Sequence, residues 1–201
     1  KATGTGWAGN LGFTWKATPR LTLGGVYHAR TNIADLQTGS GGATVSFNVD
    51  FAGASQTIPV SGKVNVKNFQ WPETFALGLA WQADERWLLA ADYKRINWSG
   101  VMKDFKMTFE GGGSTINFAM PQKWKDQTVF ELGAAYLFTP ELTGRIGVNI
   151  ANNPIPNDYV NPLFPAIIEN HYTLGAGYAV SKNSSIDFSL AYAPEVKVTT
   201  T

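Results

Sequence analysis

The residue types that most often carry chemistry are sparse in this chain. It has no cysteine and two histidines, His28 and His171. The missing thiols exclude disulfides, thiol catalysis and thiolate metal sites. Neither histidine lies in a spacing typical of a metal cluster or of a serine-histidine-aspartate set. We therefore expect no catalytic residues, no metal and no cofactor, and a membrane-embedded lipid hydrolase that uses one histidine stays open as an alternative.

One short stretch formally resembles a nucleotide-binding motif. Residues 4–9 read GTGWAG, which matches G-x-G-x-x-G. That motif binds a dinucleotide only where a strand precedes it and a helix follows, because the helix N-terminus holds the pyrophosphate. Here an alternating segment follows instead of a helix. We do not expect dinucleotide binding.

The composition is unusual for a water-soluble domain. Of 201 residues, 44% are hydrophobic and only 15% are charged, against roughly 25% charged in typical domains. The net charge of +1 gives no bulk attraction to nucleic acid. No apolar run approaches the ~18 residues of a membrane-spanning helix, and no signal peptide is recognisable. The first and last residues fall close to patterned segments, so we expect both ends to be cut from a longer chain.

Alternation with a period of two dominates the sequence. In the stretch from Phe75 to Trp81, for example, the large apolar residues stand at odd positions and small residues stand between them. This period indicates strands and not helices. Within a single segment over 1–201, we predict eight strands at about 6–16, 21–31, 67–82, 87–98, 127–138, 142–150, 171–180 and 185–193.

The predicted connections are strictly asymmetric. Four are short, at 17–20, 83–86, 139–141 and 181–184, and the three between them are long, at roughly 32–66, 97–126 and 151–170. This order is typical of antiparallel hairpins in a membrane barrel, which have short turns on one side and long loops on the other.

The nature of the two strand faces decides between a soluble sheet and a membrane barrel. The face opposite the large apolar residues is rich in Gly, Ala, Thr and Asn, whereas a water-facing sheet would carry more Lys and Glu. Aromatic residues also gather at the strand ends. One set lies near the short turns: Trp15, Trp81, Trp87, Tyr136, Phe138 and Tyr178. The other set lies at the opposite ends: Trp7, Phe75, Tyr93, Phe130, Tyr172 and Tyr192. Two aromatic belts around an apolar band predict an all-β fold, a transmembrane antiparallel β-barrel whose apolar side chains face lipid.

Four stretches resemble the FadL/TodX-type family of outer-membrane transporters for long-chain fatty acids and aromatic hydrocarbons. They are GWAGNLGFTWKATPRLTLGGVYHA, WPETFALGLAWQADERWLLAADYKRINWS, FELGAAYLFTPELTGRIGVNIANNPIP and HYTLGAGYAVSKNSSIDFSLAY. Within them, Pro72-Glu73 opens a strand, Trp98-Ser99 ends the next, and Asn152 to Pro156 follows a later strand. Each motif is weak alone, but their order across nearly the whole chain is specific.

The resemblance implies a larger barrel of about fourteen strands, of which this chain would supply the sixth to the thirteenth. The N-terminal hatch that plugs the lumen, the early strands and the closing strand would be absent. The implied function is passive transport of a hydrophobic compound, a fatty acid or a hydrocarbon, across the outer membrane of a Gram-negative bacterium. We expect a monomer in contact with the lipid bilayer and lipopolysaccharide. A general porin or structural barrel is the alternative.

The candidate ligand-binding residues follow from the same resemblance. Segment 32–66 corresponds to an extracellular loop that captures ligand, and its apolar residues include Ile33, Leu36, Phe47, Phe51 and Ile58. The alternative is an ordinary outer loop stabilised by a few apolar residues.

Charged residues are candidates for the barrel lumen. Lys106 alternates with Phe105 and Met107, so we expect it to point inward, where the family places a basic residue near a ligand carboxylate. A solvated loop lysine is the alternative. By strand phase, the lumen should also carry Arg30, Asp92, Lys94, Glu131 and Arg145, which could attract an anionic headgroup or pair with one another.

Overall fold

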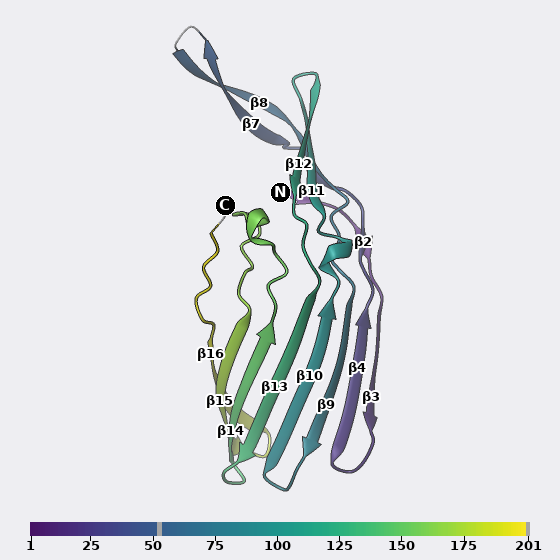
Figure 1. The fold of residues 1–201 in the computed structure, drawn as a ribbon, viewed down its shortest axis with the longest axis vertical. Coiled ribbons are helices and arrows are strands. Elements are labelled where there is room, and N and C mark those ends of the chain that lie inside the picture. The colour runs from purple at the N-terminus through teal and green to yellow at the C-terminus, as the bar shows by residue number, and fades with distance from the viewer. Residues whose placement is uncertain (52–53, 200–201) are drawn as a thin grey trace.

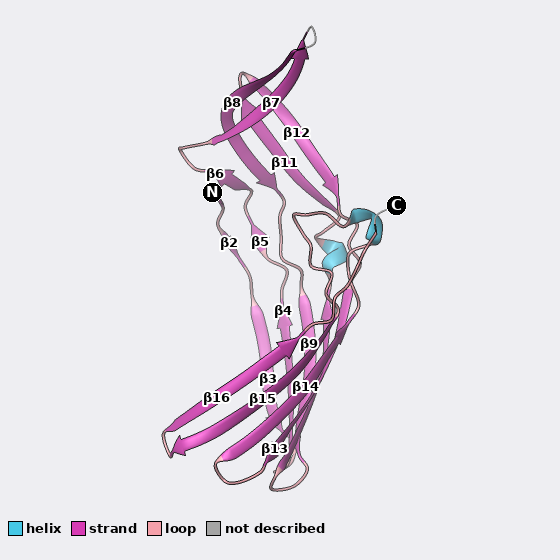
Figure 2. Cartoon of the chain, turned by 90° about the vertical axis from the view of Figure 1, so that its left-hand side faces the viewer, coloured by secondary structure: helices cyan, strands magenta, loops and turns pink. Residues whose placement is uncertain are grey.

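In a computed structural model, an eight-stranded antiparallel sheet forms the body of the molecule (Figure 1). The structure describes residues 1–51 and 54–199. The sheet has the strand order β16-β15-β14-β13-β10-β9-β4-β3. Its strands are β3 (Asn10–Lys16), β4 (Leu21–His28), β9 (Thr74–Gln82), β10 (Trp87–Ile96), β13 (Gln127–Leu137), β14 (Leu142–Ala151), β15 (Asn170–Ser181) and β16 (Ser184–Tyr192). The sheet is curved and open, with β3 and β16 at its two edges (Figure 2).

Short turns close four hairpins at one end of this sheet, which we call the turn end; the opposite end is the outer end (Figure 1). Side-chain oxygens hold three of these turns. Thr18 accepts the backbone N–H groups of Arg20 and Leu21, Asp84 accepts those of Arg86 and Trp87, and Thr139 accepts those of Glu141 and Leu142. Such bonds are the reason why Thr and Asp favour tight turns.

Each strand has one face of large apolar side chains and one face of small or polar side chains. Leu79 stands opposite Leu23 and Ala91, and these three lie on the apolar face. Gly78 stands opposite Gly24 and Asp92 on the other face. The large apolar residues are largely exposed, as for Phe130 at 52% and Leu174 at 56%. Because this apolar face is exposed, the hydrophobic core of the molecule does not lie beneath it.

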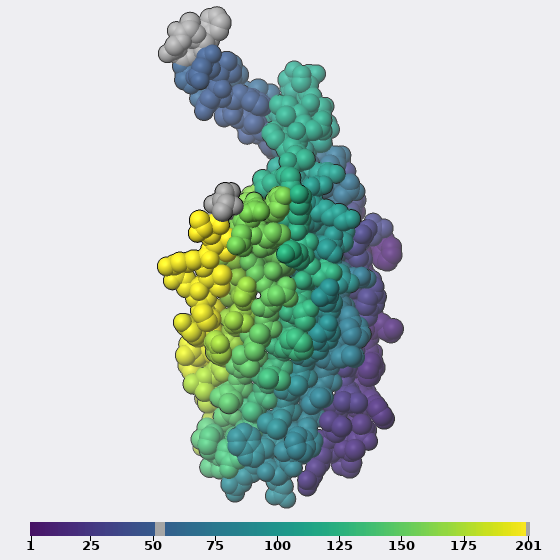
Figure 3. Space-filling model, in the orientation of Figure 1, coloured from purple at the N-terminus to yellow at the C-terminus, as the bar shows by residue number. Residues whose placement is uncertain are grey.

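A second sheet lies beyond the outer end, built from the segments expected to be plain loops. It contains β1 (Ala2–Thr3), β6 (Leu36–Thr38), β7 (Ala43–Phe51), β8 (Ala54–Lys67), β11 (Asp104–Gly111) and β12 (Ser114–Pro121). The segments at 32–66 and 97–126 are long connections between strands of the first sheet, but each of them contains an antiparallel hairpin that the sequence pattern did not predict. The β7–β8 hairpin, which we call the arm, projects away from the rest of the molecule (Figure 3).

Several strand ends differ from the expected ranges. The segment 67–82 is not one strand, because Lys67 ends β8, Asn68 takes a positive φ of 53°, and β9 begins only at Thr74. The segment 6–16 is interrupted after Trp7, which belongs to the short strand β2 (Gly6–Trp7) paired with β5 (Asn32–Ile33). Strands β4 and β10 end at His28 and Ile96, earlier than expected. At each of these places the chain leaves the first sheet to join the outer structure.

The helices of the described chain are two single turns, η1 (Trp98–Gly100) and η2 (Asn157–Tyr159). Neither is long and apolar enough to cross a membrane.

The main buried cluster lies among the connections at the outer end. Met102, Trp124 and Ile155 are each at most 6% exposed, and Phe69, Trp98, Val101, Val160, Phe164 and Ile167 pack against them. These residues come from three different connections, so this cluster ties the long connections together.

Candidate functional site

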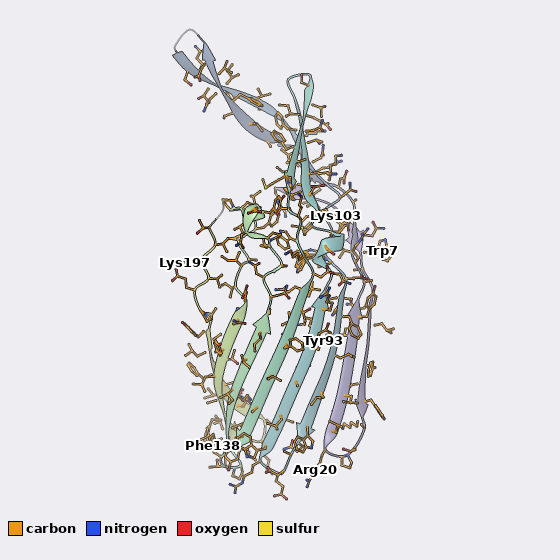
Figure 4. All side chains as sticks on the ribbon, in the orientation of Figure 1. Trp7, Arg20, Tyr93, Lys103, Phe138 and Lys197 are labelled. Carbon is orange, nitrogen blue, oxygen red and sulfur yellow. The ribbon has the colours of Figure 1, made fainter. Side chains whose placement is uncertain are left out.

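An apolar groove of about 420 Å³ lies beyond the outer end of β3 and β4. Its walls are Trp7, Ile33, Leu36, Phe69 and Trp71, and no charged side chain lines it. Trp7 is 69% exposed and projects at the side of the molecule (Figure 4). We call this site the aromatic groove. An apolar concavity with few polar groups is suited to an uncharged hydrophobic ligand.

Hydrogen bonds hold the two sides of the aromatic groove together. The side-chain amide of Gln70 accepts the Ile33 N–H at 2.8 Å and donates to the Ile33 carbonyl oxygen at 2.8 Å. The Trp71 N–H donates to Thr31 Oγ1 at 2.8 Å, and the Thr31 N–H donates to the Trp71 carbonyl oxygen. Because Ile33 and Trp71 are both bonded through backbone atoms, their side chains face the groove from fixed positions.

The groove floor depends on a close backbone approach at Gly6. A Cβ at this position would lie 2.6 Å from the Asn32 carbonyl oxygen and 2.7 Å from the Ile33 Cα. No side chain larger than hydrogen fits there without moving β5. Glycine therefore allows β2 to lie against β5, with Gly6 opposite Ile33 and Trp7 opposite Asn32.

Behind the groove, six aromatic rings form a closed cycle of contacts. In order they are Phe69, Trp71, Trp98, Trp124, Phe164 and Phe105, with successive ring centroids 5.0 to 6.3 Å apart. Each pair has the edge-to-face geometry that aromatic quadrupoles favour. Phe69 and Trp71 also line the groove, so the cycle supports two of its three aromatic walls.

Phe164 enters the cycle from the connection 152–169, which is fastened to the preceding connection. Asn161 Nδ2 donates to Gln122 Oε1 at 3.2 Å, and the Lys125 N–H donates to the Pro154 carbonyl oxygen at 2.8 Å. Lys123 Nζ lies 5.0 Å from the centre of the Tyr159 ring. A hydrogen bond to Tyr159 and the nearby phenol raise the pKa of Lys123 above its ordinary value.

Carboxylates around the outer end are held ionised by hydrogen bonds. The pKa of Glu73 is lowered first by the side-chain hydrogen bond from Asn97 and then by that from Tyr27. The pKa of Asp126 is lowered by hydrogen bonds from Ser99 and by Arg95, whose Nη2 lies 3.0 Å from Asp126 Oδ2. Beside the groove, the Asn68 N–H and Lys67 lower the pKa of Asp35. These carboxylates fix loop positions and do not enter the groove.

The structure divides the candidate ligand-binding residues between two places. Ile33 and Leu36 lie in the aromatic groove. Phe47 and Ile58 face each other across the arm, where Ile58 is 46% exposed. Phe51 ends β7, and its side chain lies outside the described part of the structure. That these residues contact a ligand stays a prediction.

Lys106 lies on β11 away from the groove. Phe105 and Met107 point to one face of this strand, and Lys106 is exposed on the other face, with Nζ 3.8 Å from Asp104 Oδ2. Its proposed role beside a ligand carboxylate stays a prediction.

The charges expected in the lumen lie on the small-residue face of the first sheet, apart from Arg30, which follows the end of β4. Lys94 pairs with Glu131 at 3.2 Å, and Arg145 pairs with Asp187 at 3.0 Å. Asp92 Oδ1 lies against Gly78, where no Cβ would fit. Arg30 is exposed, and its charge helps to lower the pKa of Glu73. The paired charges leave little free positive charge on this face.

The histidines do not assemble a recognisable catalytic site. His28 Nδ1 lies 2.7 Å from Asn10 Oδ1. Among the described residues, no group of three or more His, Asp or Glu side chains could hold a metal ion.

Comparison with known proteins settles the family. A sequence model described as outer membrane protein transport protein (OMPP1/FadL/TodX) matches residues 1–201. The chain belongs to this family. Its first sheet is therefore part of the wall of a transmembrane antiparallel β-barrel in the outer membrane of a Gram-negative bacterium. The sheet is open because the chain carries only part of that wall.

Relatives with solved structures include two toluene transporters. TodX of Pseudomonas putida is 36% identical with a TM-score of 0.77, and the match covers 94% of this chain and 44% of TodX. TbuX of Ralstonia pickettii is 33% identical with a TM-score of 0.75, over 96% of this chain and 44% of TbuX. Outer membrane protein P1 of Haemophilus influenzae is 25% identical over 98% of this chain and 39% of its own length. The chain thus spans less than half the length of these relatives.

Because the chain belongs to this family, one face of the first sheet can be assigned to the lipid and the other to the barrel lumen. The apolar face contacts lipid, as the sequence predicted, and we call it the lipid face. The face with Gly78, Lys94 and Glu131 is the lumen face.

Sequence reasoning missed most of the groove. Phe69 and Gln70 carry no recognisable motif, and Trp7 was assigned to an aromatic belt because it continues the alternation of β3. The one available signal was the density of aromatic residues at 69–71, directly before a strand.

Proposed function

We propose that the protein containing this chain admits small uncharged aromatic hydrocarbons through the outer membrane by passive diffusion, and that the aromatic groove captures them first. The observation that carries this proposal is a groove walled by Trp7, Phe69 and Trp71 with no charged lining residue. Aromatic walls favour flat apolar ligands through dispersion and edge-to-face contacts. No chemical step is needed.

The lack of any charged side chain among the described residues that line the groove favours a hydrocarbon over a fatty acid. A carboxylate taken out of water needs a charged or strongly donating partner. Lys67, which precedes the groove residue Phe69, has Nζ 3.0 Å from Asp35 Oδ2 and is thus already paired. The names of TodX and TbuX as toluene transporters support the same ligand class.

The arm extends the apolar surface away from the groove. On β8, Ile58, Val60, Val64 and Val66 stand at every second position, interrupted by Gly62, and Val66 stands opposite Leu36 of the groove. We propose that Phe47 and Ile58 collect ligand on this surface and pass it toward Leu36. Deletion of 33–58 should then abolish capture.

We further propose that residues 1–201 form one continuous segment of the barrel wall and that the protein works as a monomer in contact with lipopolysaccharide. Continuous ladder pairing from β3 to β16 supports the single segment. An unbroken lipid face on all eight strands supports a monomer, because none of the described strands presents a polar protein-binding face to the bilayer.

Replacing Trp71 by Ala tests the groove. Loss of one aromatic wall should weaken toluene binding by about tenfold, which corresponds to ~1.4 kcal/mol. The measurement is equilibrium binding of tritiated toluene to the full-length protein in detergent, with a fluorescent long-chain fatty acid as competitor. Trp15→Ala is the matched control, because Trp15 is 59% exposed on the lipid face and lies outside the groove.

Equal affinities of the Trp71→Ala and Trp15→Ala proteins would remove the groove from the proposal. Tighter binding of the fatty acid than of toluene would change the ligand class. Passage of small polar solutes without saturable binding would instead indicate a general porin.

Replacing Phe164 by Ala tests the support behind the groove. Phe164 does not line the groove, but its ring contacts those of Phe105 and Trp124. Phe105 contacts the wall residue Phe69, and Trp124 is linked through Trp98 to the wall residue Trp71. Loss of two ring contacts, each worth ~0.5–1.5 kcal/mol, should weaken toluene binding by about three- to tenfold. Leu163→Ala is the control, because this neighbour is 57% exposed and outside the buried cluster. Equal binding by the two variants would show that the cycle does not support the groove.

A further inference from the structure

The lipid face carries an apolar hollow of about 400 Å³ close to the turn end. Its floor consists of the small residues Ala134, Gly144 and Ala176, and its aromatic rim consists of Trp87, Tyr136, Phe138 and Phe188. Figure 4 shows Phe138 at the turn end, near the level of Arg20. The hollow therefore opens toward lipid, directly inside the aromatic belt of that membrane surface.

The hollow results from a gap in one row of the belt. Trp87 stands opposite Tyr136, Tyr136 opposite Gly144, Gly144 opposite Ala176, and Ala176 opposite Phe188. Large rings thus occupy both ends of a row that crosses five strands. Its centre has only Gly144 and Ala176, and the Phe138 ring lies over Gly144, where a Cβ would be 2.6 Å from it. The Trp87 and Tyr136 rings lie 4.7 Å apart and the Tyr136 and Phe138 rings 4.9 Å apart, so the rim on one side is a packed aromatic wall.

A cation without an ion-pair partner lies at the membrane-surface end of this wall. Arg86 Nη1 donates to the Tyr136 hydroxyl at 3.4 Å. Within the described residues, Arg86 makes no salt bridge, although Asp84 and Glu85 are in the same turn. The Asp84 carboxylate is occupied by the backbone N–H groups of Arg86 and Trp87, at 2.7 and 2.8 Å. The guanidinium is thus available to an anion at the depth where aromatic belts meet headgroups.

We propose that this hollow and Arg86 bind one glycerophospholipid molecule of the periplasmic leaflet. One acyl chain fills the space over Ala134 and Ala176, beside the Phe138 ring that covers Gly144, and the phosphate accepts hydrogen bonds from Arg86. The leaflet follows from the short turns, which lie on the periplasmic side of outer-membrane barrels. An apolar slot that ends at an arginine matches a molecule with an apolar tail and an anionic head.

A second hollow on the same face provides the contrast. It has about 530 Å³ and lies around Ala91, with Phe13, Trp15, Tyr93 and Phe130 among its walls. The arginine beyond its outer rim, Arg95, is already paired with Asp126 at 3.0 Å. Among the described residues, this hollow has apolar surface but no unpaired arginine at its outer rim, so we expect it to hold mobile lipid only.

Native mass spectrometry of the full-length protein, titrated with dioleoyl phosphatidylglycerol, tests the proposal. Arg86→Gln should lower the affinity of the tightest lipid by about fivefold, the effect of one cation near a membrane surface. Ala134→Leu fills the hollow and should lower it by about tenfold, since an acyl chain loses contacts of two or more methylene groups. Arg20→Gln and Ala91→Leu are the matched controls and should leave it unchanged.

Equal effects of Ala134→Leu and Ala91→Leu, or of Arg86→Gln and Arg20→Gln, would overturn the proposal. So would tighter binding of lipopolysaccharide than of phosphatidylglycerol at this hollow. If Ala134→Leu does not fold, as judged by heat-modifiable migration on gels, Ala176→Leu fills the same hollow from β15 and gives the same test.

Discussion

Replacing Leu79 by Arg is expected to destabilise the inserted barrel by about 2–4 kcal/mol, the effect of a cation near the middle of the bilayer on a lipid-facing position. Leu79 lies on the lipid face in the middle of β9, 43% exposed, with Leu23 and Ala91 beside it. An arginine there has neither water nor a carboxylate partner within the apolar band. Unfolding of the full-length protein in urea with lipid vesicles present measures the change.

Ala80→Arg is the control for this prediction. Ala80 is the next residue of β9, faces the lumen, and stands between Thr22 and Ala90. Gly78 is less suitable, because any side chain there would collide with the Asp92 carboxylate. An arginine at position 80 can reach water in the lumen, so its cost should be below about 1 kcal/mol. Similar losses at positions 79 and 80 would contradict the assignment of the two faces.

The barrel wall was predictable because one rule governs every residue in it. A strand between lipid and lumen must alternate, so Leu77, Leu79 and Trp81 repeat the same signal as Leu132, Ala134 and Tyr136. The ends of the strands were less predictable. At Asn68 and Trp7 the alternation continues while the backbone changes sheets, because side-chain pattern does not record which partner strand a segment joins.

The outer structure was mostly not predictable, for a physical reason. The aromatic cycle brings together Phe69, Trp98, Phe105, Trp124 and Phe164 from three connections. No local spacing encodes such contacts. The Gln70 amide that holds Ile33 is a further case, because an isolated glutamine in a loop carries no pattern. Ile33 and Leu36 were found only because the family resemblance marked their segment as a capture loop.

The second sheet has a core residue of its own, and its removal gives the other large expected effect. Phe109 on β11 is 2% exposed and stands opposite Val64 of β8 and Ile116 of β12. Its ring occupies the space beside two glycines: a Cβ at Gly62 would lie 2.7 Å from the Phe109 ring, and one at Gly111 would lie 2.9 Å from it. A ring enclosed this closely leaves a cavity when it is truncated.

Phe109→Ala should therefore destabilise the second sheet by about 3–5 kcal/mol, which approaches the stability of a small sheet of this kind. Phe118→Ala on the neighbouring strand β12 removes the same group from a side chain that is 43% exposed, and should cost less than about 1 kcal/mol. Hydrogen exchange should show faster amide exchange over 54–67 and 104–121 in the first variant and little change in the second. Toluene binding should fall in the first variant as well, because Leu36 loses its place beside Val66 when β8 loosens. If amide exchange did not change in Phe109→Ala, or if it became faster in the barrel strand β13 to the same extent, the second sheet would not depend on this ring.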